Sequence, residues 1–221
     1  MPQPSLIIFD LDGTLIDSAA DLTAAVNAML AAFGREPLSV AEVRRMIGDG
    51  VEMLVARALA ARQGEQGDAA EAVRIFMRHY ESHAAALTSA FPGVAEALQA
   101  LRAAAIPLAV CTNKPARVTA DLLGRLGLAP YFTRVTGGDS LPFRKPDPRV
   151  LLSLLKSFEA RPESALLVGD SEVDAATARA SGVPFVLMKH GYRRGPAEEI
   201  PCVAALESFD QLPALVGALP R

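Results

Sequence analysis

Aromatic side chains are scarce in this sequence of 221 residues, which has no tryptophan, three tyrosines and nine phenylalanines. Its core must therefore be built mainly from aliphatic side chains. Only two cysteines are present, Cys111 and Cys202, and two cannot make a disulfide framework. Cys111 ends an apolar run, which indicates a buried, reduced thiol. We expect the protein in a reducing compartment, the cytoplasm.

Excess positive charge and long apolar runs are also absent. Against 25 aspartates and glutamates stand 22 lysines and arginines, which gives a net charge of −3. Domains that bind nucleic acid are usually strongly basic, so the sequence argues against that class. No run reaches the roughly 18 apolar residues that span a bilayer, and the first residues lack a signal-peptide pattern. We expect no nucleic-acid or membrane partner, and either a monomer or a homodimer.

Short apolar runs alternate with helical patterns over most of the chain. Runs typical of strands buried on both faces lie at 5–9, 106–112, 165–168 and 183–188, with a weaker one at 132–136. Helical patterns fill the intervals at 93–104, 115–126, 147–158 and 172–181. This alternation predicts right-handed βαβ units, and therefore an α/β fold with a doubly wound, mainly parallel sheet.

Residues 16–90 break this alternation, because their patterns are helical only and one polar stretch, 63–67, reads as a loop. Three places have the pattern of a helix N-terminus: Ser18 with Asp21, Ser39 with Glu42, and Asp68. We therefore predict a core domain made of residues 1–15 and 91–221. The helices of 16–90 would form an inserted cap domain over the carboxyl end of the first strand.

Polar groups follow several of the predicted strands. They are Asp10-Leu11-Asp12-Gly13-Thr14 after the first strand, Thr112-Asn113-Lys114 after the second, Arg144-Lys145-Pro146-Asp147-Pro148 in a loop, and Gly169-Asp170-Ser171 with Asp174 beyond. Ligands of open α/β sheets bind outside the carboxyl ends of the strands. These groups therefore define one candidate site.

Asp10 and Asp170 place two carboxylates at the tips of neighbouring buried strands, where their charges repel each other. A hard divalent cation removes that conflict, and Mg²⁺ is usually held by few carboxylates together with water and a substrate phosphate. Lys145 adds positive charge, while Thr112 and Asn113 add donors for phosphoryl oxygens. The pattern indicates a Mg²⁺ site for a small phosphorylated substrate.

An aspartate beside a bound phosphoryl group can act as a covalent nucleophile, and Asp10 is suited to this role. Asp12 can protonate the leaving alkoxide and later accept a proton from the attacking water. Gly13 permits the chain reversal that brings Asp12 back toward Asp10. Each group taken alone is more often a turn, a helix cap or a solvated loop. Their joint occurrence after successive predicted strands favours the catalytic interpretation.

The four polar groups resemble the four motifs of the haloacid dehalogenase superfamily of aspartate-nucleophile phosphotransferases, and residues 16–90 resemble its helical cap. The resemblance implies that Asp10 is the nucleophile and a Mg²⁺ ligand. It implies that Asp12 is the acid/base and binds Mg²⁺ through its backbone carbonyl. Lys145 would neutralise charge on the phosphoryl group as part of the catalytic set.

The resemblance implies further roles at the remaining motifs. Thr112, also catalytic, and Asn113 would hold phosphoryl oxygens, while Asp170 would be a Mg²⁺ ligand supported by Ser171 and Asp174. The residues expected to bind substrate are Gly13, Thr14, Arg44, Gly48, Gly50, Asn113 and Lys114.

Other stretches are similar to bacterial phosphoglycolate phosphatases. They include Gly48-Asp49-Gly50, Phe91-Pro92-Gly93-Val94, Thr112-Asn113-Lys114-Pro115, Gly137-Gly138-Asp139-Ser140-Leu141-Pro142, Lys145-Pro146-Asp147-Pro148 and His190-Gly191-Tyr192. This similarity covers nearly the whole chain. It implies hydrolysis of 2-phosphoglycolate to glycolate and phosphate through an aspartyl-phosphate intermediate, with Mg²⁺ as cofactor.

Several alternative functions remain beside this one. Pyrophosphate, a sugar phosphate or a nucleotide are alternative substrates, and a phospho-aspartate signalling protein or a non-catalytic binding protein are more distant alternatives. Asp12 argues against a dehalogenase, and the absence of lysine from 16–90 argues against a phosphonate hydrolase. Thr14 and the composition of the cap favour hydrolysis over a hexose-phosphate mutase.

Arg44 and Arg45 precede Gly48-Asp49-Gly50, a turn suited to covering the phosphate site. We hypothesise that an arginine here meets a small carboxylate on the substrate. The alternative is a solvated helix face, and Asp49 would repel such a carboxylate if it pointed inward.

Overall fold

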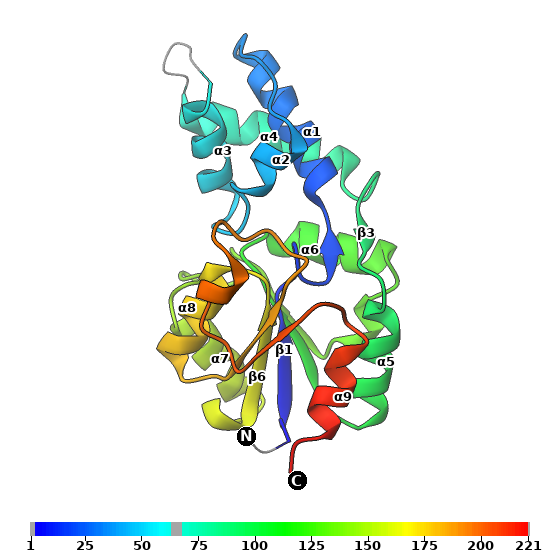
Figure 1. Cartoon of the computed structure of the whole chain (residues 1–221). Helices are drawn as coiled ribbons and strands as arrows, with labels where there is room; N and C mark the ends of the chain where they lie inside the picture. Colours follow the sequence, from blue (N-terminus) through cyan, green and yellow to red (C-terminus); the bar gives the residue numbers. More distant parts are fainter. Residues whose placement is uncertain (1–2, 63–67, 221) are drawn as a thin grey trace.

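The central element of the computed structural model, which describes residues 3–62 and 68–220, is a six-stranded sheet (Figure 1). Its strands lie in the order β5-β4-β1-β6-β7-β8, and every neighbouring pair is parallel. Their bounds are β1 (Leu6–Phe9), β4 (Leu108–Cys111), β5 (Arg134–Thr136), β6 (Ala165–Gly169), β7 (Phe185–Met188) and β8 (Ala204–Leu206). The predicted α/β fold with a doubly wound parallel sheet is confirmed.

β1 lies between β4 and β6 and is buried along its whole length. Ile7 pairs with Leu108 on one side and with Leu166 on the other. A strand with neighbours on both edges and helices on both faces has no side exposed to solvent, which explains its unbroken apolar sequence. The last strand, β8, was not predicted, because its Ala-Ala-Leu sequence is short and only weakly apolar.

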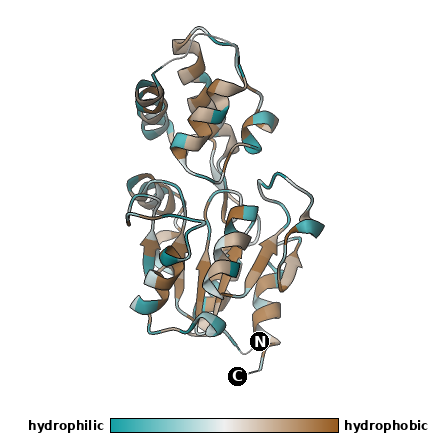
Figure 2. Ribbon diagram, turned by 90° about the vertical axis from the view of Figure 1, so that its left-hand side faces the viewer, coloured by the Kyte–Doolittle hydropathy of each residue, from teal (hydrophilic) through white to brown (hydrophobic). Residues whose placement is uncertain are grey.

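Alternate side chains of β1 point to opposite faces of the sheet and belong to two separate hydrophobic clusters. Ile7 and Phe9 pack with α5, α6 and α9, whereas Leu6 and Ile8 pack with α7 and α8. The bounds of these helices are α5 (Val94–Ala103), α6 (Ala116–Arg125), α7 (Arg149–Ser157), α8 (Glu172–Ser181) and α9 (Gln211–Gly217). Figure 2 shows the hydrophobic residues concentrated along the strands between the two helical layers.

Within the described part of 19–83, four helices lie beyond the carboxyl ends of the strands, at the end of the molecule opposite the two termini (Figure 1). They are α1 (Ala19–Ala32), α2 (Val40–Arg44), α3 (Val51–Ala60) and α4 (Ala69–His83). A two-stranded antiparallel ribbon of β2 (Ile16–Asp17) and β3 (Ser89–Ala90) joins them to the sheet. The expectation of helices only in 16–90 is therefore wrong at both ends, because a strand of two residues is too short to give an alternating pattern. Three single turns of 3₁₀ helix complete the description: η1 (Ala129–Tyr131), η2 (Pro162–Ser164) and η3 (Ala197–Glu199).

Two of the three expected helix caps form as predicted. Ser39 and Glu42 make a reciprocal capping box at the start of α2, and Asp68 accepts a hydrogen bond from the backbone N–H of Ala70. The third expectation is wrong, because the Ser18 side chain makes no cap bond and its hydroxyl donates to Asp12 instead. The loop expected at 63–67 lies outside the described residues. Within those residues, no helix is both long and apolar enough to cross a membrane.

Two neighbouring leucines on α7 test the packing of the sheet. Leu151 is fully buried, whereas Leu152 is 43% exposed. We expect Leu151→Ala to lower the free energy of unfolding by about 2–5 kcal/mol, because it leaves a cavity beside β1 and β6. Leu152→Ala should change it by no more than about 0.5 kcal/mol. Urea denaturation of both variants measures this difference, and equal losses would contradict the assigned register of α7.

Candidate active site

Three polar residues follow three adjacent strands directly. Asp10 comes after β1, Thr112 after β4 and Asp170 after β6, in the strand order β4-β1-β6. Because parallel strands end at the same edge of a sheet, the three side chains are placed side by side there. All three are buried. The fold therefore brings Asp10, Thr112 and Asp170 together at one edge of the sheet, as the sequence predicts.

Asp10, Asp170 and Asp174 form a cluster of buried carboxylates, with one oxygen from each within 4.8 Å of the others. Lys145 enters this cluster from the loop before α7. Its Nζ lies 2.8 Å from Asp10 Oδ1 and 2.6 Å from Asp174 Oδ1. One ammonium therefore faces three carboxylates, and the cluster carries a surplus of negative charge when all of them are ionised.

Burial and like charge shift the acidity of this cluster. Burial raises the pKa of Asp10 to about 6, although the nearby Lys145 opposes this effect. Burial, together with the charges of Asp174 and Asp10, raises the pKa of Asp170 well above its usual value. Burial alone would lower the pKa of Lys145, but the two facing carboxylates raise it instead. Lys145 is therefore a permanent cation, and the two aspartates are in an environment that favours added positive charge.

This set of residues fits a hard divalent cation. Asp10 Oδ1 is buried and accepts no well-aligned hydrogen bond, even though Lys145 Nζ is close. Asp174 is the most fully engaged of the three, because it accepts hydrogen bonds from Lys145 Nζ and the Ser171 hydroxyl and also from the backbone N–H groups of Asp170 and Ser171. Oxygen ligands from carboxylates are those that Mg²⁺ and Ca²⁺ prefer. Asp10 and Asp170 are consequently the carboxylates best suited to bind the cation, with Asp174 and Ser171 beneath them.

Asp170 is held by hydrogen bonds to both of its carboxylate oxygens. Thr14 Oγ1 donates to its Oδ1 at 2.8 Å, and the backbone N–H of Tyr192 donates to its Oδ2 at 2.6 Å. A Cβ at Gly13 or Gly191 would collide with the Asp170 carboxylate. Gly13 also has φ +83°, a conformation that favours glycine. The predicted substrate residues Gly13 and Thr14 thus lie against the carboxylate cluster and not in the cavity described below.

Asp12 lies apart from the carboxylate cluster and forms an ion pair of its own. Both of its carboxylate oxygens lie 2.8 Å from Lys114 Nζ, and Oδ1 also accepts the Ser18 hydroxyl. The Lys114 side chain is 2% exposed. Burial would lower the pKa of Lys114, but Asp12 raises it, so Lys114 stays charged.

A cavity of about 40 Å³ lies between the sheet edge, helices α1, α3 and α4, and the segment that joins α2 to α3. Its lining residues from the core are Asp10, Asp12, Thr112, Asn113, Lys114 and Pro115, and those from 16–90 are Leu22, Ile47, Gly48, Gly50, Val51, Leu54 and Tyr80. Asn113 Nδ2 donates to the carbonyl oxygens of Gly48 and Lys145, at 2.9 Å each. One water needs roughly 10–15 Å³ of cavity volume, so this cavity has room for only a few small groups.

Arg44 is placed away from this cavity, in contrast to the hypothesis that it meets a substrate carboxylate. Its guanidinium pairs with Asp17 at 2.7 Å and lies over the Tyr192 ring, 5.2 Å from its centre. Arg45 is exposed. The reason is local: α2 ends at Arg44 and directs this side chain to the ribbon that joins 16–90 to the sheet.

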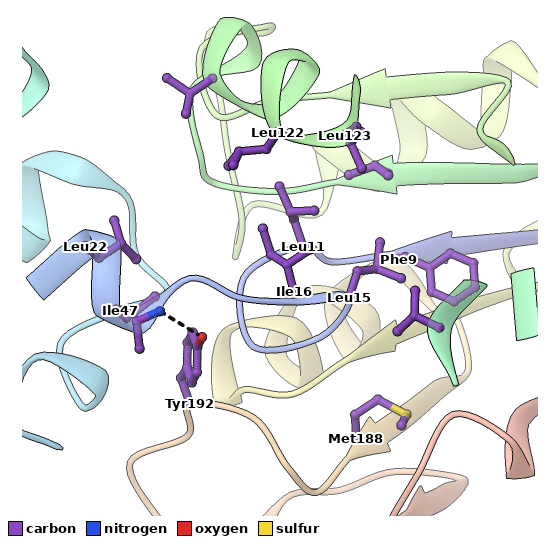
Figure 3. Packing of buried hydrophobic residues seen from close by; sticks show 14 of the residues in the cluster. Phe9, Leu11, Leu15, Ile16, Leu22, Ile47, Leu122, Leu123, Met188 and Tyr192 are labelled. Atoms are coloured by element: carbon purple, nitrogen blue, oxygen red, sulfur yellow. Dashed lines mark hydrogen bonds between the residues drawn. The ribbon is translucent and has the colours of Figure 1, made fainter. Parts of the chain in front are cut away.

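Sequence reasoning missed three residues around the site. Tyr80 stands at helical spacing with Phe76, a pattern typical of a core residue, yet it also lines the cavity. The sequence predicts Ser18 as a helix cap, but its hydroxyl binds Asp12 instead. The Tyr192 hydroxyl accepts hydrogen bonds from the backbone N–H groups of Ser18 and Ala19, at the start of α1. Figure 3 shows Tyr192 among the buried residues with one of these bonds drawn as a dashed line. The available signal for Tyr80 was its hydroxyl, which is unusual on an otherwise apolar helix face.

Comparison with known proteins agrees with this geometry. A family model described as haloacid dehalogenase-like hydrolase matches residues 7–188. The chain belongs to this family. The match runs from β1 to β7 and so includes all four motifs and the inserted helices.

Relatives within the haloacid dehalogenase-like hydrolases are similar over almost the whole chain. A phosphoglycolate phosphatase of Cereibacter sphaeroides is 46% identical, covering 96% of this chain and 98% of that protein. Phosphoglycolate phosphatase 1 of Pseudomonas aeruginosa is 45% identical, covering 95% and 79%. The crystal structure of a predicted phosphoglycolate phosphatase from Haemophilus somnus has a TM-score of 0.93 at 31% identity, covering 97% and 99%.

The surplus charge of the carboxylate cluster predicts a gain in stability on removing one charge. Asp170 has a raised pKa in the folded state, so its own contribution to the stability of the metal-free protein falls as the pH rises above about 4, where the unfolded chain ionises. We expect Asp170→Asn to unfold at a higher temperature than the wild type in EDTA at about pH 8, by ~2–4 °C for each kcal/mol gained. The difference should shrink toward about pH 5, where the wild-type carboxyl is protonated more often.

Thermal unfolding of the wild type and of Asp170→Asn, in EDTA and in Mg²⁺, measures this difference in stability. Mg²⁺ should stabilise the wild type more than Asp170→Asn, because binding to the folded state raises stability by mass action. Asp121→Asn, an exposed aspartate paired with Arg125 on α6, is the matched control and should follow the wild type. A destabilised Asp170→Asn at every pH would contradict the electrostatic account.

Proposed function

We propose that the protein is a Mg²⁺-dependent phosphatase that converts 2-phosphoglycolate to glycolate and phosphate through an aspartyl-phosphate intermediate. The observation that carries this proposal is that Asp10 and Asp12 line one small cavity beside a buried carboxylate cluster. Relatives that are 45–46% identical over almost the whole chain are named phosphoglycolate phosphatase, which supports the choice of substrate. The small cavity also favours a two-carbon substrate over a nucleotide.

The residues that would hold Mg²⁺ are Asp10 and Asp170 through their side chains and Asp12 through its backbone carbonyl. The cation supplies positive charge that attracts the phosphoryl oxygens and stabilises the charge they gain in the transition state. Lys145 adds a second positive charge at Asp10. Thr112 and Asn113, which line the cavity, donate hydrogen bonds to the remaining phosphoryl oxygens.

The first chemical step is attack by a carboxylate oxygen of Asp10 on phosphorus. With a pKa of about 6, Asp10 is mostly ionised at neutral pH and is competent as a nucleophile. The bond from phosphorus to the glycolate oxygen breaks, and Asp12 donates a proton to that oxygen. In the second step a water attacks the phosphorus of the aspartyl phosphate. Asp12 accepts its proton, and Asp10 is released with inorganic phosphate.

Lys114 and Ser18 hold the Asp12 side chain at the cavity wall, through three contacts to its two oxygens. A proton donor acts only within hydrogen-bond reach of the leaving oxygen, so its orientation matters as much as its acidity. Lys114 therefore positions Asp12 in addition to lining the cavity. Ser18 lies at the start of α1, which ties the orientation of Asp12 to the position of the inserted helices.

We further propose that residues 16–90 act as a cap domain that opens for substrate and closes for chemistry. Exposed ion pairs join it to the core, among them Glu52 with Arg144 at 2.7 Å and Glu81 with Arg117. Such pairs contribute about 0–1 kcal/mol each, so they hold the cap weakly. Closure would exclude bulk water from the cavity. Two unpaired cysteines fit the cytoplasmic location that we propose.

Replacement of the nucleophile tests the mechanism. We expect Asp10→Asn to lower kcat by at least ~10³-fold, because an amide cannot form the acyl phosphate. Removal of Mg²⁺ with EDTA should also abolish activity, and Mg²⁺ should restore it better than Ca²⁺, which prefers more ligands. Release of phosphate from 2-phosphoglycolate is the measurement, with Asp121→Asn as the control that keeps activity. Substantial turnover by Asp10→Asn would contradict covalent catalysis.

A substrate panel tests the choice of 2-phosphoglycolate. We expect its kcat/KM to exceed those of pyrophosphate, sugar phosphates, nucleotides and phosphoserine by at least about tenfold, or roughly 1.4 kcal/mol of transition-state discrimination. Steady-state phosphate release with the wild-type enzyme measures each value. A clear preference for another compound would replace the proposed substrate and leave the phosphatase assignment standing.

A further inference from the structure

The helical insertion contributes one polar side chain to the cavity. Of the seven residues from 16–90 that line it, four are aliphatic, two are glycines and the last is Tyr80. Tyr80 comes from α4, the last helix of the insertion, and is only 1% exposed. Any hydrogen bond that the insertion offers to a ligand through a side chain in this cavity must therefore come from the Tyr80 hydroxyl.

That hydroxyl makes no well-aligned hydrogen bond within the described part of the chain, although the Lys114 ammonium is close enough for a contact between them to oppose the rise of its pKa. A buried hydroxyl without a partner costs about 1–3 kcal/mol. Burial raises the pKa of Tyr80 to about 12, so the group is a neutral phenol and an available donor at neutral pH. Its ring is well held, because it stacks on Phe76 at 5.6 Å between ring centres. The donor is thus fixed in place while its hydrogen bond is left unmade.

Lys114 lies directly beside this donor. Its Nζ is 4.8 Å from the centre of the Tyr80 ring and is the only ammonium that lines the described cavity. Two of its contacts go to the oxygens of Asp12, and an ammonium has three N–H donors. The third donor faces the Tyr80 hydroxyl oxygen, and this contact helps to raise the pKa of Lys114, while the Tyr80 O–H itself is left to donate. The pair offers a cation and a neutral donor on the same wall of a small cavity.

We propose that Tyr80 and Lys114 together bind the carboxylate of the substrate and that Tyr80 is a specificity-determining residue. This inference rests on the proposed function, because the phosphoryl group occupies the Asp10 side of the cavity. The non-reacting end of a two-carbon phosphomonoester then faces the remaining wall. A carboxylate matches a cation with a neighbouring O–H donor, and it satisfies the buried hydroxyl. Arg44, which pairs with Asp17, has no part in this contact.

The position of Tyr80 also connects recognition with cap closure. Lys114 belongs to the core and Tyr80 to the insertion, so both reach one carboxylate only when the cap lies over the sheet edge. Binding energy from the non-reacting end of the substrate would then favour the closed arrangement. A substrate without a carboxylate would lack this contribution.

Tyr80→Phe is the decisive variant, because it removes the hydroxyl and keeps the ring that packs on Phe76 and Lys114. Its kcat/KM should be compared for 2-phosphoglycolate and for ethyl phosphate, a two-carbon phosphomonoester without a carboxylate. We expect about a tenfold loss for 2-phosphoglycolate, mainly as a higher KM, since a hydrogen bond to a charged group is lost. Ethyl phosphate should change by less than about twofold, since it never makes this bond. Tyr131→Phe, the same change at a tyrosine outside the cavity, should alter neither value.

A second measurement uses the product. Glycolate should compete with ethyl phosphate in the wild type, and its inhibition constant should rise by about tenfold in Tyr80→Phe. The role of Tyr80 would be overturned if Tyr80→Phe lowered kcat/KM equally for both substrates. It would also be overturned if the variant changed neither the preference for 2-phosphoglycolate nor the inhibition by glycolate. Either result leaves the proposed function standing. A wild type that hydrolyses ethyl phosphate at least as well as 2-phosphoglycolate would overturn the proposed substrate, and with it the carboxylate site.

Discussion

Buried negative charge is the constraint on which the rest of this structure depends. Asp10, Asp170 and Asp174 lie within reach of one another at the edge of the sheet, with Lys145 as the one ammonium in contact among the described residues. Such a cluster costs stability when all of its carboxylates are ionised, and the raised pKa values of Asp10 and Asp170 express that cost. A bound cation and a phosphorylated substrate are the chemistry that relieves it.

The surrounding architecture keeps the cluster from relaxing. Asp170 is held by Thr14 and by the backbone of Tyr192, and two glycines allow the chain to approach it closely. The Tyr192 hydroxyl accepts hydrogen bonds from backbone N–H groups at the first turn of α1, where the inserted helices begin. The proposed metal site and the entry to the cap are therefore connected through one side chain. Asp12 is connected to the same turn through Ser18.

Much of the site could be predicted because its residues follow strands directly. Asp10 and Asp170 come after unbroken apolar runs, and the edge at which parallel strands end is shared, so their proximity follows from the strand order. Ser18 and Tyr80 could not be assigned in this way. A serine before a helix and an aromatic residue at helical spacing have common structural roles. The contact of Ser18 with Asp12 spans only six residues but depends on how the chain between them folds back, and the place of Tyr80 at the cavity depends on segments far apart in sequence. The hypothesis that Arg44 meets the substrate is wrong because its side chain pairs with Asp17, which lies on the connecting ribbon.

The sequence by itself determined the parallel sheet, the helical insertion and the set of strand-end groups, since hydrophobic periodicity and residue order along the chain are local properties. Only the tertiary structure decided how the charges pair. Lys114 is bound to Asp12 and Lys145 to Asp10 and Asp174. It also decided that Tyr80, and not Arg44, is the residue of the insertion with a polar side chain in the described cavity. Which buried groups meet depends on how the helices of 16–90 pack on the sheet edge, and that packing is not encoded in any single segment.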